Sequence, residues 1–269
     1  MKQATDPACW DHTSHSEFVE YYADKSIHPK QLEHFRGLRN AILRVLERYE
    51  GSGKKYDVLD IGCNAGGQCS IWAEQEHRVH GLDVNEPLME LARKRANESG
   101  HRIDYRLGTA TDLPWADSSM DVCIATELLE HVREWERCVD EFIRVLRPGG
   151  ALLVTTTNKM CPRQCEFNLP FYSWYPKKLK QHYERLAVST RPDLANNAKY
   201  PAVHWFSPYG LASEFRRKGL DPLDRFDIAD TSRKNNWGKL AFRSIRAVPV
   251  LRFLAHGCFA GTTILGVKR

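Results

Sequence analysis

Apolar runs of strand length alternate with amphipathic stretches along most of the chain. Helical three- and four-residue apolar spacing appears at 70–76, 87–99, 134–145 and 208–218, and strand-like runs occupy 56–62, 78–82, 103–106, 120–125, 151–156, 219–228 and 261–268. This alternation is typical of a parallel sheet covered on both faces. We therefore expect an α/β fold with a doubly wound, mostly parallel seven-stranded sheet and helices on both faces.

The same rhythm divides the chain into four parts of a single domain, 1–269. A long helical pattern at 16–49 predicts an N-terminal helical cap over residues 1–50. The regular alternation covers 51–158, lapses in an insert at 159–206, and resumes at 207–269, which holds the closing strands and a basic amphipathic segment.

Composition indicates a globular protein of ordinary size but does not indicate its function. The chain is 42% hydrophobic, enough for one ordinary core, and its formal net charge of +5 is too small to indicate nucleic acid by itself. The sequence shows no apolar signal region and no run of about 18 apolar residues, so we expect a cytoplasmic protein. Cys161 and Cys165 have no second pair at zinc spacing, which favours reduced thiols.

The strongest chemical signal is the turn after the first strand. Residues 60–67 read Asp-Ile-Gly-Cys-Asn-Ala-Gly-Gly, whereas a dinucleotide site would show G-x-G-x-x-G. The carboxylate of Asp60 would repel a pyrophosphate but suits an ammonium group. Asp83 closes the second strand and can accept the protons of both ribose hydroxyls.

These residues resemble class I S-adenosylmethionine (SAM)-dependent methyltransferases over about 56–158. The glycine turn, Asp83, the 108–114 loop, 121–127 and the Leu-Arg-Pro-Gly-Gly stretch at 146–150 fall in the family's order, although Asn64 replaces the middle glycine. The resemblance implies a Rossmann-like methyltransferase fold with 51–158 as the SAM-binding core and the insert as acceptor pocket. It implies these cofactor-binding residues: Asp60, Gly62, Cys63, Gly66, Asp83, Val84, Ala110, Thr111, Asp112 and Thr126.

A second candidate site follows the fourth strand, at 126–132. If a helix opens at Glu127, then Glu127, Glu130 and His131 can converge on a divalent cation that orients an acceptor hydroxyl and lowers its pKa. Alternatively the site holds no metal, Glu130 caps a turn, and His131 acts as a general base or packs beside the cofactor. The spacing alone leaves both interpretations open.

A closer resemblance favours the metal. The Glu127-x-x-Glu130-His131 pattern resembles the metal-binding signature of ubiquinone-biosynthesis O-methyltransferases, shared with small-RNA 3′-terminal 2′-O-methyltransferases, which use a further histidine. His204 is the candidate fourth ligand, unless it is a surface or packing histidine. The likeness implies Mg²⁺ or a similar ion at Glu127, Glu130, His131 and His204, catalytic roles for His131, Glu130 and His204, and an Arg39 pair with the cofactor carboxylate.

The insert at 159–206 and the basic segment at 231–269 give information about the methyl acceptor and about possible partners. Aromatic residues of the insert suit a flat or lipophilic acceptor or form a small core: Phe167, Phe171, Tyr172, Trp174, Tyr175, Tyr183, Tyr200 and Trp205. Residues 231–269 contain no acidic residue and alternate basic with apolar side chains. Such a segment is typical of peripheral contact with an anionic membrane, and equally of a phosphate- or RNA-binding face or a solvated basic face.

We therefore expect SAM-dependent O-methylation of a small-molecule hydroxyl, catechol-like, phenolic or lipophilic. The alternatives are an RNA 2′-O-methyltransferase, an N- or C-methyltransferase of a small metabolite, and a cofactor-binding scaffold without turnover. The modest charge and the lack of an appended RNA-binding module make nucleic acid the weaker partner. Both a monomer and a homodimer fit the sequence.

Overall fold

The computed structural model describes residues 16–51, 53–164, 166–195, 202 and 204–269. Its strands are β1 (Asp57–Ile61), β2 (Arg78–Asp83), β3 (Ile103–Leu107), β4 (Met120–Thr126), β5 (Leu146–Thr157), β6 (Leu220–Asp224) and β7 (Gly261–Lys268). Its helices are α1 (Ser16–Ile27), α2 (Pro29–Glu50), α3 (Gly67–Ala73), α4 (Glu86–Glu98), α5 (Trp135–Val145), α6 (Lys177–Ser189), α7 (Pro208–Arg217), α8 (Arg225–Ile228), α9 (Asn236–Ala247) and α10 (Pro249–His256).

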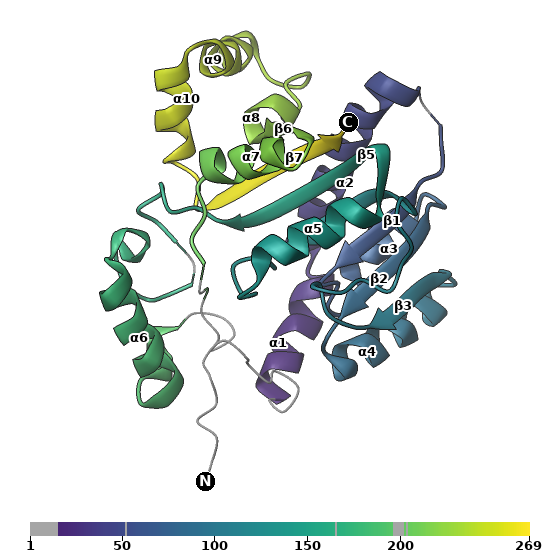
Figure 1. The fold of residues 1–269 in the computed structure, drawn as a ribbon, viewed down its shortest axis with the longest axis horizontal. Coiled ribbons are helices and arrows are strands. Elements are labelled where there is room, and N and C mark those ends of the chain that lie inside the picture. The colour runs from purple at the N-terminus through teal and green to yellow at the C-terminus, as the bar shows by residue number, and fades with distance from the viewer. Residues whose placement is uncertain (1–15, 52, 165, 196–201, 203) are drawn as a thin grey trace.

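The seven strands form one sheet in the order β3-β2-β1-β4-β5-β7-β6, which confirms the predicted fold class. β1 to β5 pair in parallel, and β7 runs antiparallel between β5 and β6 (Figure 1). Ile61 pairs with Leu82 of β2 and with Ala125 of β4. Gly62, Asp83 and Thr126 are therefore neighbours at the carboxyl edge, where α/β sheets bind ligands.

Helices cover both faces of the sheet. One apolar cluster joins α2, α3 and α4 to the sheet, and a second joins α5 and α7 to the other face. α5 shows why these segments fold as helices: Cys138, Val139, Phe142 and Val145 lie three or four residues apart and are fully buried. The helical pattern at 16–49 divides at His28, because a residue before proline avoids the helical region.

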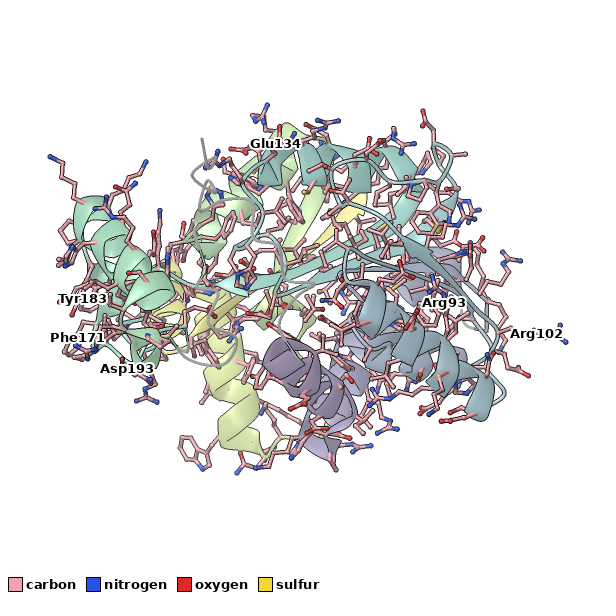
Figure 2. All side chains as sticks on the ribbon, turned by 90° about the horizontal axis from the view of Figure 1, so that it is seen from below. Arg93, Arg102, Glu134, Phe171, Tyr183 and Asp193 are labelled. Atoms are coloured by element: carbon pink, nitrogen blue, oxygen red, sulfur yellow. The ribbon has the colours of Figure 1, made fainter. Side chains whose placement is uncertain are left out.

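The insert forms a small unit of its own, which Figure 1 shows with α6 apart from the main sheet. Phe167 and Tyr172 stack with ring centroids 4.1 Å apart, and Trp205 packs edge-on against Tyr172. Figure 2 shows Phe171, Tyr183 and Asp193 together at this end of the molecule, opposite Arg93 and Arg102. Tyr200 and Cys165 lie outside the described residues. Phe167, Tyr172, Tyr175, Tyr183 and Trp205 thus belong to a mini-core, whereas Phe171 and Trp174 are exposed.

The C-terminal part departs from the predicted strand at 219–228. β6 ends at Asp224, whose carboxylate accepts the amide protons of Phe226 and Asp227 and so caps the short helix α8. The basic tail then folds into α9 and α10 before β7 returns to the sheet. No helix in the described part of the chain is long and apolar enough to cross a membrane.

Candidate functional site

A cavity of about 250 Å³ opens at the carboxyl ends of β1, β2 and β4. It is lined from the sheet side by Asp60, Gly62, Cys63, Asn64, Gly67, Gln68, Asp83, Val84, Thr109, Ala110 and Thr126. The segment after β4 adds Glu127, Leu128, His131 and Val132, and the N-terminal helices add Tyr22, Lys25, Ser26, Gln31 and Phe35. The cavity therefore contains both the predicted cofactor turn and part of the predicted acceptor segment.

The glycine turn places its backbone at the wall of the cavity. Gly62 has a φ of 77°, and the amides of Gly62 and Cys63 both donate to the carbonyl of Leu82, at 2.7 and 3.0 Å. A Cβ on Gly62 would lie 3.2 Å from Cδ1 of Leu128. Asn64, with a φ of 47°, adopts the left-handed region that asparagine tolerates, and its side-chain Nδ2 donates to the Gly62 carbonyl at 3.1 Å. Asparagine at the middle position therefore preserves the turn.

Asp83 is held rigidly by backbone amides. One carboxylate oxygen accepts the amide proton of Asn64 and the other that of Asn85, each at 2.9 Å. Burial raises the pKa of this carboxyl, and the two amides oppose that rise. The carboxylate also lines the cavity, and each of its oxygens can accept more than one hydrogen bond. The group therefore suits a pair of hydroxyl donors such as those of a ribose.

Asp60 belongs to a buried chain of polar side chains. Its carboxylate accepts from the side-chain Nε2 of Gln68 at 3.0 Å, and the side-chain Oε1 of Gln68 accepts from the Thr126 hydroxyl at 3.2 Å. Burial raises the pKa of Asp60 to about 7. A cationic ligand in the cavity would favour the ionised form. The sequence indicated Asp60 and Thr126, whereas Gln68 is visible only in the structure.

Not every predicted cofactor residue lines the cavity. Arg39 donates to the Ile71 carbonyl at 2.7 Å and so fastens α2 to α3. Gly66 lies under Tyr105, whose hydroxyl would be 2.2 Å from an added Cβ. In the 108–114 loop, Thr109 and Ala110 reach the cavity, while Thr111 and Asp112 are outside its lining.

The segment after β4 does not open a helix. Glu127 has a φ of 50°, the amides of His131 and Val132 form turns to Leu128 and Leu129, and α5 begins only at Trp135. The i,i+3 and i,i+4 geometry expected for Glu127, Glu130 and His131 is therefore absent. Glu127 and His131 line the cavity, but Glu130 does not.

Glu130 points into the protein. It is fully buried, one carboxylate oxygen accepts from the Thr156 hydroxyl at 2.8 Å, and the other has no hydrogen-bond partner among the described residues. Burial and then repulsion by Glu127 raise the pKa of Glu130 well above its usual range. The Nε2 of His204 lies 3.2 Å from the carbonyl of Arg133. Burial lowers the pKa of that imidazole.

These positions do not fit the expected metal site. Across residues 16–51, 53–164, 166–195, 202 and 204–269, no three histidine, cysteine, aspartate or glutamate side chains are placed to hold an ion. Glu130 is turned toward Thr156, and the His204 ring is turned toward a backbone carbonyl. In this structure Glu130 and His204 therefore do not converge with Glu127 and His131, and metal binding by these four residues stays a prediction.

A third acid and a tyrosine interact with this part of the molecule, and only the tyrosine lines the cavity. Burial, together with repulsion by Glu127, raises the pKa of Glu166 to about 7. Tyr22, which lines the cavity from α1, has its pKa raised by burial and then by the charge of Glu166. No sequence pattern indicates either residue, because α1 and the insert approach the end of β4 only through the tertiary fold.

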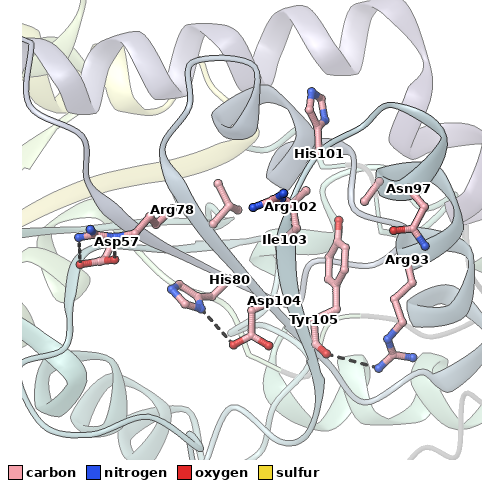
Figure 3. Close-up of a pocket in the computed structure, with 12 residues that line it drawn as sticks. Asp57, Arg78, His80, Arg93, Asn97, His101, Arg102, Ile103, Asp104 and Tyr105 are labelled. Carbon is pink, nitrogen blue, oxygen red and sulfur yellow. Dashed lines mark hydrogen bonds and ion pairs between the residues drawn. The ribbon is translucent and has the colours of Figure 1, made fainter.

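A second depression lies near the amino ends of β1, β2 and β3 (Figure 3). Several of its polar groups pair with one another: Arg78 pairs with Asp57, His80 lies 3.2 Å from Asp104, and Arg93 donates to the Tyr105 carbonyl. Parallel α/β sheets bind ligands at the opposite edge. The cavity at the carboxyl edge is therefore the functional candidate.

Comparisons with known proteins agree with this placement. A family model described as a methyltransferase domain matches residues 59–154. A probable SAM-dependent methyltransferase of Mycolicibacterium smegmatis is 38% identical over 104 residues, 39% of each chain. A ubiquinone biosynthesis O-methyltransferase of Sinorhizobium medicae is 38% identical over 186 residues, 67% of this chain and 66% of the relative. The chain thus spans between two fifths and two thirds of these relatives' lengths.

A comparison with solved structures supports the fold. The crystal structure of a SAM-dependent methyltransferase from Mesorhizobium loti superposes with a TM-score of 0.53 at 16% identity, covering 85% of this chain and 98% of that one. The matched domain contains the glycine turn, Asp83 and the residues that follow β4. The chain belongs to the class I SAM-dependent methyltransferase family.

Proposed function

We propose that the protein transfers the methyl group of SAM to a hydroxyl oxygen of a small, phenolic or lipophilic acceptor. The observation that supports this most directly is that His131 lines the same cavity as Asp60, Asp83 and Thr126. An imidazole is a suitable base for a hydroxyl proton at neutral pH. The relatives named ubiquinone biosynthesis O-methyltransferases support oxygen as the acceptor atom.

The residues of the cofactor side fit the cofactor by their chemistry. Asp83 offers two carboxylate oxygens for ribose hydroxyls, and Asp60 offers a buried carboxylate for an ammonium group. SAM supplies an electrophilic methyl group carried on a sulfonium. Glycine at position 62 keeps the backbone free to approach it, since a side chain there would press on Leu128.

The residues of the acceptor side then orient and deprotonate the acceptor. The His131 imidazole accepts the hydroxyl proton as the oxygen attacks, and Tyr22 and Lys25 of α1 close the cavity against water. A divalent metal has no part in this proposal, because Glu130 and His204 are turned to Thr156 and Arg133.

Comparing two histidine variants tests the proposal. We expect His131→Asn to lower kcat with catechol acceptors by about 10²- to 10⁴-fold, because the general base is lost. His204→Asn is the matched control and should retain turnover. S-adenosylhomocysteine affinity, measured by calorimetry, should stay unchanged in both variants. Loss of turnover in His204→Asn with normal turnover in His131→Asn would contradict the assignment.

A specific observation favours an amine acceptor as a second candidate. Burial, and then repulsion by Glu127, raises the pKa of Glu130 and of Glu166, and a cationic group bound beside Glu127 in the cavity would favour the ionised form of both acids. Assaying matched phenols and amines decides between them: faster turnover of amines would move the acceptor atom from oxygen to nitrogen.

A further inference from the structure

The helix pair α9–α10, inserted between β6 and β7, has an unusual distribution of polarity. On α10 the polar side chains face the protein: Arg252 donates to Asp224 at 2.7 Å, and the Nε2 of His256 lies 2.8 Å from the same carboxylate. The solvent side is apolar, with exposed fractions of 66% for Val250, 42% for Leu251, 56% for Phe253 and 59% for Leu254. An ordinary surface helix has the opposite arrangement.

α9 continues the same apolar surface and adds positive charge. Trp237 is 80% exposed and Leu240 is 53% exposed, while Phe242 packs toward Phe226 in the interior. Arg243 is exposed and Lys239 is half-buried. No side-chain hydrogen bond or ion pair within the described residues engages either cation. The 231–269 segment contains no acidic residue to neutralise them.

We propose that the exposed face of α9–α10 docks on a membrane surface that carries anionic headgroups. The apolar side chains would enter the interface while the cations meet the headgroups, and tryptophan suits this boundary. A second copy of the chain is the weaker occupant. A symmetric contact through the same face would bring the cations of one copy to those of the other.

The surface is tied to the acceptor end of the cavity. The side-chain amide of Asn158 donates to the carbonyls of His256 at 2.9 Å and Phe259 at 2.8 Å. Asn158 follows β5 directly, and Thr155 of the same strand accepts the amide proton of Glu127, which lines the cavity. Docking would therefore place the carboxyl edge of the sheet near the membrane. If the proposed O-methylation holds, that position suits an acceptor dissolved in lipid.

Vesicle flotation of the full chain tests the docking. We expect binding to phosphatidylcholine vesicles containing phosphatidylglycerol, little binding to phosphatidylcholine alone, and release by high salt. The double variant Trp237→Ser with Leu254→Ser should lose at least about tenfold in partitioning. Lys239→Ser and Arg243→Ser should each lose about fivefold.

Matched controls separate this surface from other exposed aromatic groups. Phe171 and Trp174, each 58% exposed on the insert, provide the control double variant Phe171→Ser with Trp174→Ser, which should bind as the native chain does. S-adenosylhomocysteine affinity reports intact folding in every variant and is independent of docking. The proposal is overturned if the folded protein binds no anionic vesicle, or if the control loses binding equally. A native dimer that Trp237→Ser with Leu254→Ser renders monomeric would assign the surface to a second copy instead.

Discussion

The two sides of the cavity handle buried carboxylates in opposite ways. On the cofactor side, Asp83 accepts two backbone amide protons and Asp60 accepts from Gln68, so each acid has a fixed donor. On the acceptor side, Glu127 lines the cavity and two further acids interact with it: burial, and then repulsion by Glu127, raises the pKa of Glu130 and Glu166, and one oxygen of Glu130 has no hydrogen-bond partner in the described chain.

The cofactor side of the cavity is therefore preorganised, whereas the carboxyl groups near the acceptor side can respond to a bound ligand. Donors that are already in place need no rearrangement when a ligand arrives, which favours tight and specific binding. Carboxyl groups that repel one another can change protonation when a ligand brings charge or displaces water. We infer that the cofactor side supplies most of the binding energy and that the acceptor side responds to the bound acceptor.

Removing Asp83 should produce the largest change on the cofactor side. Asp83→Ala deletes the acceptor of two hydroxyl hydrogen bonds, each charge-assisted, so we expect S-adenosylhomocysteine affinity to fall about 100-fold by calorimetry. Asp104→Asn, in the depression of Figure 3, is the control and should bind normally. Equal losses in both variants would move the ligand away from the carboxyl edge.

A glycine substitution tests how firmly α1 closes the cavity. A Cβ on Gly67 would lie 2.0 Å from the carbonyl oxygen of Ser26, so Gly67→Ala should push α1 outward. We expect the free energy of unfolding to fall by about 1–3 kcal/mol in denaturant titrations. Gly37→Ala, in a helix with open space around the added carbon, should be neutral or stabilising. Similar losses for both would show that α1 is loosely held.

The smallest expected effect is a pH dependence on the cofactor side. Because the pKa of Asp60 is raised to about 7, this carboxyl is largely protonated at pH 6 and ionised at pH 8. Affinity for the cationic methionine arm should therefore rise with pH, by up to about tenfold across this interval. Asp60→Asn should remove the dependence. An affinity that falls with rising pH would contradict the ammonium contact.

The sequence predicted best what local pattern and strand register determine. Asp60, Gly62 and Asp83 lie close together because parallel strands align their carboxyl ends. The end of each predicted strand is therefore enough to predict that these residues are neighbours. The seven-stranded sheet followed from the alternation of apolar runs, including the closing strands near the C-terminus.

The positions of the other site residues depend on tertiary contacts, which the sequence pattern does not reveal. Arg39 reaches a carbonyl 32 residues away, and Glu130 is turned inward by Thr156, neither of which spacing can reveal. Glu166 and Tyr22 approach Glu127 from distant segments. The reversed polarity of α10 depends on Asp224, which draws Arg252 and His256 inward.

A crystal structure with S-adenosylhomocysteine tests the central claim most directly. We predict ligand density in the cavity at the carboxyl ends of β1, β2 and β4, with the ribose hydroxyls on Asp83 and the sulfur beside Thr126. Density in the depression of Figure 3, or an empty cavity in crystals of protein that binds the ligand in solution, would contradict the account.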